Sequence, residues 1–234
     1  PYPETSTKRL KSGSYAEKWS ISPNEWLTYS EVLALQKAAE KRKNHSKTGI
    51  KDWMFINIGL YTGLRISEIA ALDCQDIVLS GAAYPYVFVR QGKTNNSRRK
   101  VPISKDFKAI IIEYKNLKKN ILGETWKDNE PLLHSPIGNS HYTRFGLYES
   151  FRRVLSLTSS IDKPERLHPH SLRHAYAVHL YAMTKDLLLI KELLGHSSTK
   201  VTEVYTDVFD EYKLGCVDRL YQRHKKNICP YCGK

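Results

Sequence analysis

Long apolar runs are missing from this sequence, and none of its segments approaches the roughly 20 apolar residues that a membrane span needs. The longest candidate, residues 186–194, is interrupted by Lys191 and Glu192. Hydrophobic residues nevertheless make up 41% of the 234 residues, which is ordinary for a globular protein and argues against disorder. We therefore expect a soluble, cytoplasmic protein with a substantial core.

Cysteine is scarce as well. The four cysteines are too few for a dense disulfide framework and fit a reducing intracellular compartment. Cys229 and Cys232 form a C-x-x-C pair, which Cys216 and His224 can complete to a zinc site of uncommon spacing. Because a lone C-x-x-C pair has low specificity for zinc, we expect no metal cofactor and a basic tail over residues 227–234. The zinc site is the alternative.

Acidic residues are outnumbered: 24 Asp and Glu face 37 Lys and Arg, which gives a formal net charge of +13. An excess of this size favours a polyanionic partner, and nucleic acid is the commonest one. The alternative is a solvated basic surface without a particular ligand. The chain also begins without Met or an apolar signal core, so we expect a piece of a longer protein.

The periodicity of the apolar residues predicts a mainly α domain that carries a small antiparallel β-hairpin or sheet. A capping box, Thr28-x-x-Glu31, begins the first predicted helix. The helices predicted in the first part of the chain span residues 28–43, 51–61 and 65–72. From residue 104 to residue 226 the chain is predicted to be mostly helical, with breaks near residues 123–129, 135–139, 162–169 and 195–198.

The β-hairpin is predicted from two extended segments. Residues 84–90 are aromatic and β-branched, and the extended pattern resumes at residues 100–103. The polar segment between them carries turn signals, so the hairpin has a basic tip. We expect a basic linker or arm over residues 1–25 and one domain over residues 26–226.

A first candidate site residue is Arg65, in the sequence Thr-Gly-Leu-Arg-Ile-Ser-Glu. Gly63 permits a turn that places the guanidinium at the start of the next helix. There the planar guanidinium and the helix N–H groups can both bind a phosphate. Taken alone, a surface ion pair with Glu68 is the commoner explanation for such an arginine.

A second motif is His-Pro-His-Ser-Leu-Arg-His at residues 168–174. Pro169 suits a helix start and puts His170 and Arg173 on one face of the first turn. A histidine and an arginine at the positive end of a helix can hold one phosphate and manage one proton. The alternative is that the histidines only cap the helix. Structural work of that kind is assigned to His168, His174 and His179.

A third motif, Leu-Gly-His-Ser-Ser, includes His196. Gly195 is predicted to cap one helix and a serine to begin the next, which holds His196 in a tight corner. Tyr205 follows nine residues later. The chain has 15 tyrosines, and such a residue usually serves packing, so only its distance from His196 singles Tyr205 out.

Taken together, these motifs resemble the tyrosine recombinase or phage integrase family. The arginine motif, H-x-L-R-H, L-G-H-S-S and the tyrosine follow in order over about residues 28–224. The resemblance implies that Arg65 and Arg173 hold the scissile phosphate and that His170 handles the proton of the nucleophile. It implies further that His196 hydrogen-bonds the phosphate and that Tyr205 attacks it. The products are a 3′-phosphotyrosyl link and a free 5′-hydroxyl.

The resemblance also implies a general-acid lysine in the hairpin, for which Lys93 fits best. Glu68 matches an acidic position that orients the catalytic groups. The expected DNA-binding residues beside the lysine are Arg98, Arg99 and Lys100. Because cations stabilise the charge of the transition state and a lysine protonates the leaving oxygen, the chemistry is expected to need no cofactor.

The expected protein is thus a site-specific DNA recombinase that acts on double-stranded DNA as a homotetramer, associated with the nucleoid. Integration or excision of a mobile element is the expected role. The alternatives are a chromosome-dimer or plasmid resolvase, a type IB topoisomerase and a non-catalytic DNA-binding protein. An apolar stripe after Tyr205 docks onto a neighbouring subunit in this family, but we expect it to fold back in the isolated chain. Its residues are Leu214, Val217, Leu220 and Tyr221.

Overall fold

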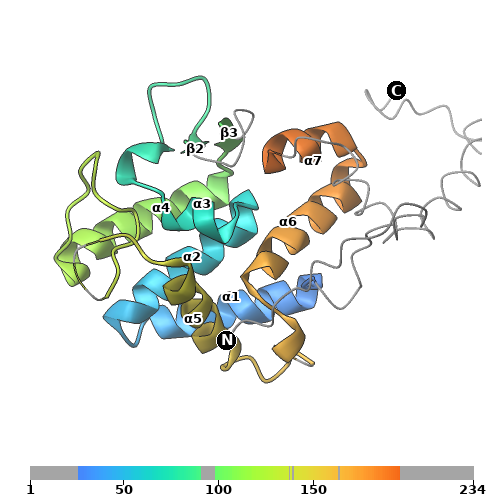
Figure 1. Ribbon diagram of the computed structural model, residues 1–234, viewed down its shortest axis with the longest axis horizontal. Helices are drawn as coiled ribbons and strands as arrows, with labels where there is room; N and C mark the ends of the chain where they lie inside the picture. Colours follow the sequence, from blue (N-terminus) through green and yellow to red (C-terminus); the bar gives the residue numbers. More distant parts are fainter. Residues whose placement is uncertain (1–25, 91–97, 137, 139, 163, 196–234) are drawn as a thin grey trace, which may run out of the picture.

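The computed structural model describes residues 26–90, 98–136, 138, 140–162 and 164–195. These residues form a mainly helical body with a three-stranded antiparallel sheet at one edge (Figure 1), which confirms the predicted fold class. Several predictions fall outside the described residues. They concern Lys93, His196, Tyr205, Cys216, His224, Cys229, Cys232 and the stripe from Leu214 to Tyr221.

The first three helices are α1 (Tyr29–Lys43), α2 (Lys47–Thr62) and α3 (Ile66–Ala70). The predicted capping box of α1 is confirmed, because Thr28 and Glu31 hydrogen-bond reciprocally. The second helix begins four residues before the predicted start, since the Ser46 hydroxyl caps it by accepting from the Gly49 amide at 2.9 Å.

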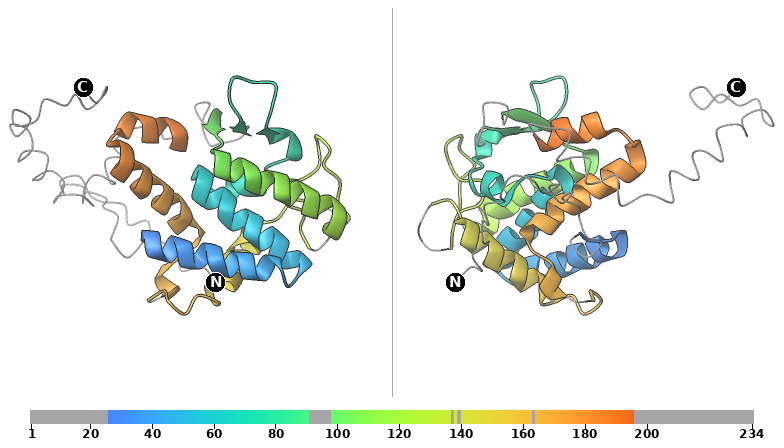
Figure 2. Two further views of the ribbon diagram at one scale, coloured as in Figure 1. Left: turned by 180° about the vertical axis from the view of Figure 1, so that it is seen from behind. Right: turned by 45° about the vertical axis from the view of Figure 1, so that its right-hand side comes forward.

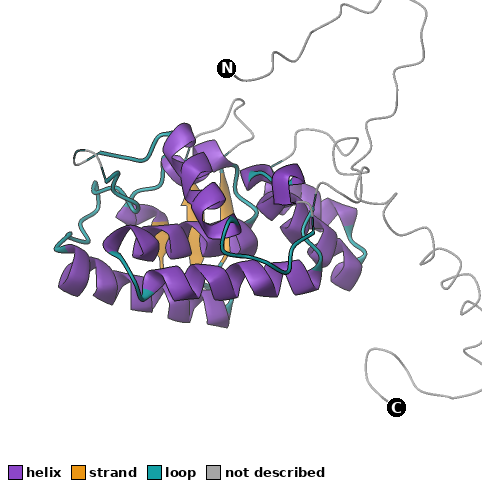
Figure 3. Ribbon diagram, turned by 90° about the horizontal axis from the view of Figure 1, so that it is seen from below, coloured by secondary structure: helices purple, strands orange, loops and turns teal. Residues whose placement is uncertain are grey.

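The sheet contains β1 (Ile77–Val78), β2 (Tyr86–Val89) and β3 (Arg99–Pro102) in that order. Strands β2 and β3 are the predicted hairpin, and β1 was not predicted because two residues are too short to show a period. A short 3-10 turn, η2 (Cys74–Asp76), leads into β1. Seen from below, the strands lie beyond the helices (Figure 3).

Helix α4 (Lys105–Leu117) continues into a π-helical turn, η4 (Lys118–Leu122), and α5 spans Arg144–Leu155. The helix implied between the predicted breaks, over residues 130–134, is wrong. There the backbone carbonyls bind side chains instead. The Tyr114 hydroxyl donates to the Leu132 carbonyl at 2.9 Å, and the Lys118 ammonium donates to the Pro131 carbonyl at 2.9 Å.

After a 3-10 turn, η5 (Pro164–Arg166), the last described helices are α6 (Pro169–Thr184) and α7 (Leu187–Leu194). The predicted start at Pro169 and the predicted cap at Gly195 are confirmed. The break between α6 and α7 was not predicted. It occurs because Lys185 takes a left-handed conformation and the Asp186 carboxylate accepts from the first amides of α7.

Helix α2 is buried along most of its length, and α1, α4, α5 and α6 pack around it (Figure 2). At one point on α2, the fully buried Asp52 carboxylate binds Arg42 of α1 and Arg153 and Ser150 of α5. These contacts fix three helices around one charge. Within the described part of the chain, every helix is too short or too polar to cross a membrane.

Candidate active site

The buried carboxylate of Glu68 collects guanidinium groups from three elements. Glu68 Oε1 lies 3.0 Å from Nη1 of Arg65 and 2.9 Å from Nη1 of Arg99. Its Oε2 accepts from the Arg65 backbone amide at 2.8 Å and from Arg99 Nη2 at 3.0 Å, while Arg173 Nη1 is 3.9 Å away. We call these four residues the Glu68 cluster. They join α3 and its N-terminus, β3 and α6.

The charges of the Glu68 cluster do not balance. Three guanidinium groups and one carboxylate carry a formal charge of +2. Burial alone raises the pKa of Glu68, but the hydrogen bond and charge of Arg99 outweigh it, so this pKa lies below its usual range. Glu68 is therefore ionised at neutral pH, and the cluster still has the excess positive charge that attracts an anion.

The turn at Gly63 places Arg65 as the sequence predicted. Gly63 caps α2 with φ of +61°, and Arg65 then occupies the position just before the first residue of α3. A Cβ atom on Gly63 would lie 2.4 Å from Cδ1 of Tyr176, so only glycine fits between the helices. The Arg65 side chain is 36% exposed, which leaves part of it accessible to a ligand.

Arg173 is buried at the centre of the arrangement. Its Nη1 donates to the Gly63 carbonyl and its Nη2 to the Leu194 carbonyl, both at 2.8 Å. Carbonyls at helix C-termini lack partners within the helix and attract cations. Arg173 thus ties α6 to the ends of α2 and α7.

His170 lies in the first turn of α6, with its ring perpendicular to that of His174 at a centroid distance of 4.5 Å. The residue as a whole is exposed, but protein atoms around its ring shield the ring from water. This desolvation lowers the pKa of His170 to about 4, and the positive charges of Arg173, His168 and Arg65 act in the same direction. At neutral pH the ring is neutral and able to accept a proton. His179 instead packs against Trp26 and Tyr29.

The three basic residues predicted to bind DNA at the hairpin do not point the same way. Arg98 and Lys100 are exposed, and the Lys100 ammonium lies 4.7 Å from the centre of the Tyr86 ring. The Arg99 side chain is only 7% exposed and turns inward to Glu68. A groove separates the hairpin from α7, and its lining residues are Tyr84, Arg98, Arg99, Lys100, Leu188, Lys191, Glu192 and Gly195.

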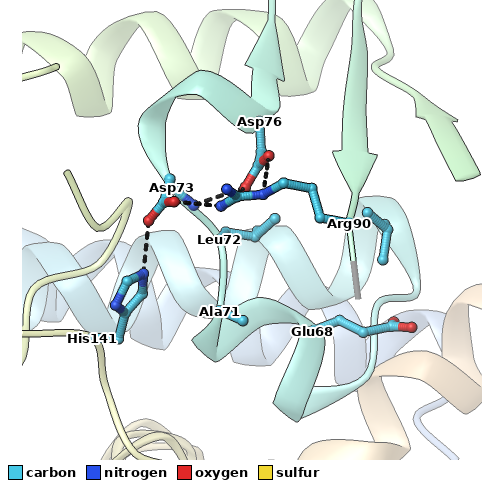
Figure 4. A pocket seen from close by; sticks show the side chains of 8 residues that line it. Glu68, Ala71, Leu72, Asp73, Asp76, Arg90 and His141 are labelled. Carbon is cyan, nitrogen blue, oxygen red and sulfur yellow. Dashed lines mark hydrogen bonds and ion pairs between the residues drawn. The ribbon is translucent and has the colours of Figure 1, made fainter. Parts of the chain in front are cut away.

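A cavity beside Glu68 holds a second ion-pair network, which sequence reasoning missed. Arg90 binds the carboxylates of Asp73 and Asp76, and His141 Nε2 lies 2.7 Å from Asp73 Oδ1 (Figure 4). The Glu68 side chain points away from this network. The available signal was local, because Asp76 accepts from the Asp73 amide in a capping arrangement.

In the described residues, no three His, Cys, Asp or Glu side chains gather as ligands for a metal ion.

A family model described as the phage integrase family matches residues 25–212. The chain belongs to this family.

Two relatives show how much of a phage integrase family protein this chain covers. Tyrosine recombinase XerC of Chromohalobacter salexigens is 29% identical over 181 residues, 77% of this chain and 56% of that protein. Tyrosine recombinase XerD of Staphylococcus epidermidis is 31% identical over 183 residues, 78% of this chain and 57% of that protein. The chain therefore spans little more than half the length of these relatives.

Solved structures confirm the catalytic-domain fold of tyrosine recombinases. The XerH recombinase bound to its difH substrate, before cleavage, matches with a TM-score of 0.65 and 22% identity, over 85% of this chain and 53% of that one. The integrase of the Tn1549 transposon, in complex with circular intermediate DNA, matches with a TM-score of 0.65 and 20% identity, over 86% of this chain and 68% of that one.

Proposed function

We propose that this phage integrase family chain is the part of a site-specific recombinase that cleaves and rejoins DNA, with Tyr205 as nucleophile. The observation that carries the proposal is the Glu68 cluster, which gathers three arginines where α7 ends. Arg173 donates to the Leu194 carbonyl, and Gly195 caps α7 directly before His196 in the sequence. The family to which the chain belongs supports the same chemistry.

In the proposed reaction, His170 takes the proton of the Tyr205 hydroxyl, and the phenolate oxygen bonds to phosphorus. The bond between phosphorus and the 5′-oxygen breaks, and that oxygen takes a proton from Lys93. The products are a 3′-phosphotyrosyl link and a 5′-hydroxyl, and rejoining reverses these steps with a hydroxyl from another strand. Charge and protons come from side chains, so the proposed step uses neither a metal nor a nucleotide.

Arg65 and Arg173 are the proposed ligands of the non-bridging oxygens, with His196 as a further donor. Charged donors fixed in place stabilise the developing negative charge of the transition state, and removing one typically costs about 10²–10³ in rate. The neutral ring of His170 supports its role, because a protonated ring cannot accept the proton of tyrosine.

The proposed partner is double-stranded DNA, bound by a homotetramer through a single catalytic domain over residues 26–226. The net charge of +13 supports a polyanionic partner. Matching structures include a lambda integrase tetramer bound to a Holliday junction. We propose integration or excision of a mobile element as the role, and the solved structures that share the fold include a transposon integrase. The alternative is a chromosome-dimer or plasmid resolvase of the same family.

The test uses the full-length protein and a pool of nicked duplexes with randomised sequence around the nick. Loss of the short fragment beside the nick prevents rejoining, so cleaved DNA stays attached to the protein. We expect the wild type to give a denaturation-resistant protein–DNA band. Tyr205→Phe removes the nucleophilic oxygen, so it should bind the DNA and give no band. Tyr29→Phe, at an exposed tyrosine of α1, should behave as wild type.

Each alternative has its own outcome in this test. A non-catalytic DNA-binding protein gives no band with any variant. A type IB topoisomerase gives the band but relaxes supercoils without bringing two DNA segments together. A band that persists in Tyr205→Phe contradicts the assignment of the nucleophile.

A further inference from the structure

We propose that Arg99 is a positioning residue of the active site, which fixes the hairpin, α3 and the end of α7 relative to one another. This inference rests on the proposed recombinase function. Arg99 was expected to bind DNA from the hairpin tip, but its side chain faces the protein and is 7% exposed. It acts through Glu68 and through the backbone before His196.

The Arg99 guanidinium binds two elements at once. Two of its nitrogens bind the two oxygens of Glu68 at 2.9 and 3.0 Å, and Nε donates to the Leu193 carbonyl at 2.7 Å. The planar arginine fork matches a carboxylate with two parallel hydrogen bonds while a third N–H remains for another acceptor. A single side chain of β3 thus holds both the Glu68 carboxylate, which also binds Arg65, and the last turn of α7.

Gly195 packs closely against the Arg99 side chain. A Cβ atom there would lie 2.8 Å from Nη1 of Arg99 and 3.1 Å from its Cδ. Gly195 also has φ of +65°, which disfavours other residues. The guanidinium therefore lies against the turn whose next residue in the sequence is His196.

The position of Arg99 in the sequence gives these contacts their meaning. Lys93, the proposed acid, precedes β3 in the hairpin segment, and His196 follows Gly195. Arg65 shares Glu68 with Arg99. Arg99 is thus part of, or in contact with, the three chain segments that carry the proposed acid, the proposed hydrogen-bond donor to the phosphate, and Arg65. Misplacing reacting groups by about 1 Å can cost about 10² in rate.

The experiment measures single-turnover cleavage of a nicked duplex at saturating DNA, together with DNA affinity and thermal stability. We compare Arg99→Met, which removes the charge, with Arg99→Lys, which keeps the charge but not the fork. The matched control is the same pair of substitutions at Arg90, which also binds two carboxylates but belongs to the separate network in Figure 4. Rates are normalised to the folded fraction of each variant.

For Arg99→Met we expect a maximal cleavage rate about 10²-fold below wild type with DNA affinity nearly unchanged, and for Arg99→Lys a loss of about tenfold. The Arg90 variants lose thermal stability but cleave at close to the wild-type rate. A purely structural role predicts equal rates for the two sets after normalisation, and that result overturns the inference. If Arg99→Met fails to fold, the test rests on Arg99→Lys. Cleavage by Arg99→Lys at the wild-type rate then overturns the inference.

The wild-type reaction distinguishes a failure of the proposed function from a failure of the positioning role of Arg99. If the wild type gives no covalent complex, the proposed function fails and takes this inference with it. If the wild type reacts and the Arg99 variants match it, only the positioning role is wrong.

Discussion

The protonation of His170 is the residue-scale property that most directly affects the proposed proton transfer. Protein atoms around the ring shield it from water, and this desolvation, together with the positive charges of Arg173, His168 and Arg65, lowers the pKa of His170 to about 4. We therefore expect the ring to titrate near pH 4 when its proton signals are followed by NMR between pH 3 and 8. His170→Gln identifies the signal by removing it. A titration near the ordinary value of 6.5 contradicts the description of this site.

The same shift makes stability depend on pH in a defined window. As pH falls from about 6.5 to about 4, the unfolded chain binds a proton at this position before the folded chain does. His170 therefore lowers the free energy of unfolding across that window and has no such effect above it. Urea unfolding of wild type and His170→Gln should show a smaller decrease in the variant as pH falls.

Single residues also show what the sequence can predict. The ion pair of Arg65 and Glu68 follows from spacing, because residues three apart on a helix are neighbours. The inward turn of Arg99 does not, because its partners Glu68 and Leu193 lie 31 and 94 positions away in the sequence. Contacts at such separations depend on the tertiary fold, so Arg99 was grouped with the exposed residues beside it.

At the scale of elements, the end of α2 tests how tightly the site is built. We expect Gly63→Ala to lower the free energy of unfolding by about 1–3 kcal/mol, because φ of +61° is strained for alanine and its Cβ would meet the Tyr176 ring at 2.4 Å. Gly81→Ala is the matched control, since Gly81 has φ of +80° but nothing within 4 Å of the added atom. Urea unfolding should show the smaller loss there, and equal losses contradict the close packing.

Elements with strong local signals were predicted, and those set by tertiary contacts were not. The capping box at Thr28, the proline at the start of α6 and the glycine at the end of α7 are local signals, and each is confirmed. The two-residue β1 and the break at Lys185 were missed. Residues 130–134 were wrongly predicted to be helical. Carbonyls of this segment instead accept hydrogen bonds from the side chains of Tyr114 and Lys118.

At the scale of the whole molecule, the excess of basic residues predicts salt-dependent DNA binding. Each phosphate contact contributes about 0.9 to the slope of log affinity against log salt. Arg98 and Lys100 are exposed beside the groove next to α7, so replacing both by alanine should reduce the slope by about 2. The control replaces Arg152 and Lys119, an exposed pair of the same charge on α5 and η4.

Titrating labelled duplex at several salt concentrations measures both slopes. Equal slopes for the two double variants contradict the proposed DNA-binding surface, because they show that only the net charge matters. A reduced slope for the Arg98 and Lys100 variant places the phosphate backbone at the groove between the hairpin and α7.

The central claim is that the Glu68 cluster surrounds a phosphodiester which Tyr205 attacks. The most direct measurement is mass spectrometry of the covalent complex formed on a nicked duplex, after digestion of both the protein and the DNA. The account predicts that the peptide containing Tyr205 carries a nucleotide linked through a 3′-phosphate to the tyrosine oxygen. A nucleotide attached to any other residue, or linked through its 5′ end, contradicts it.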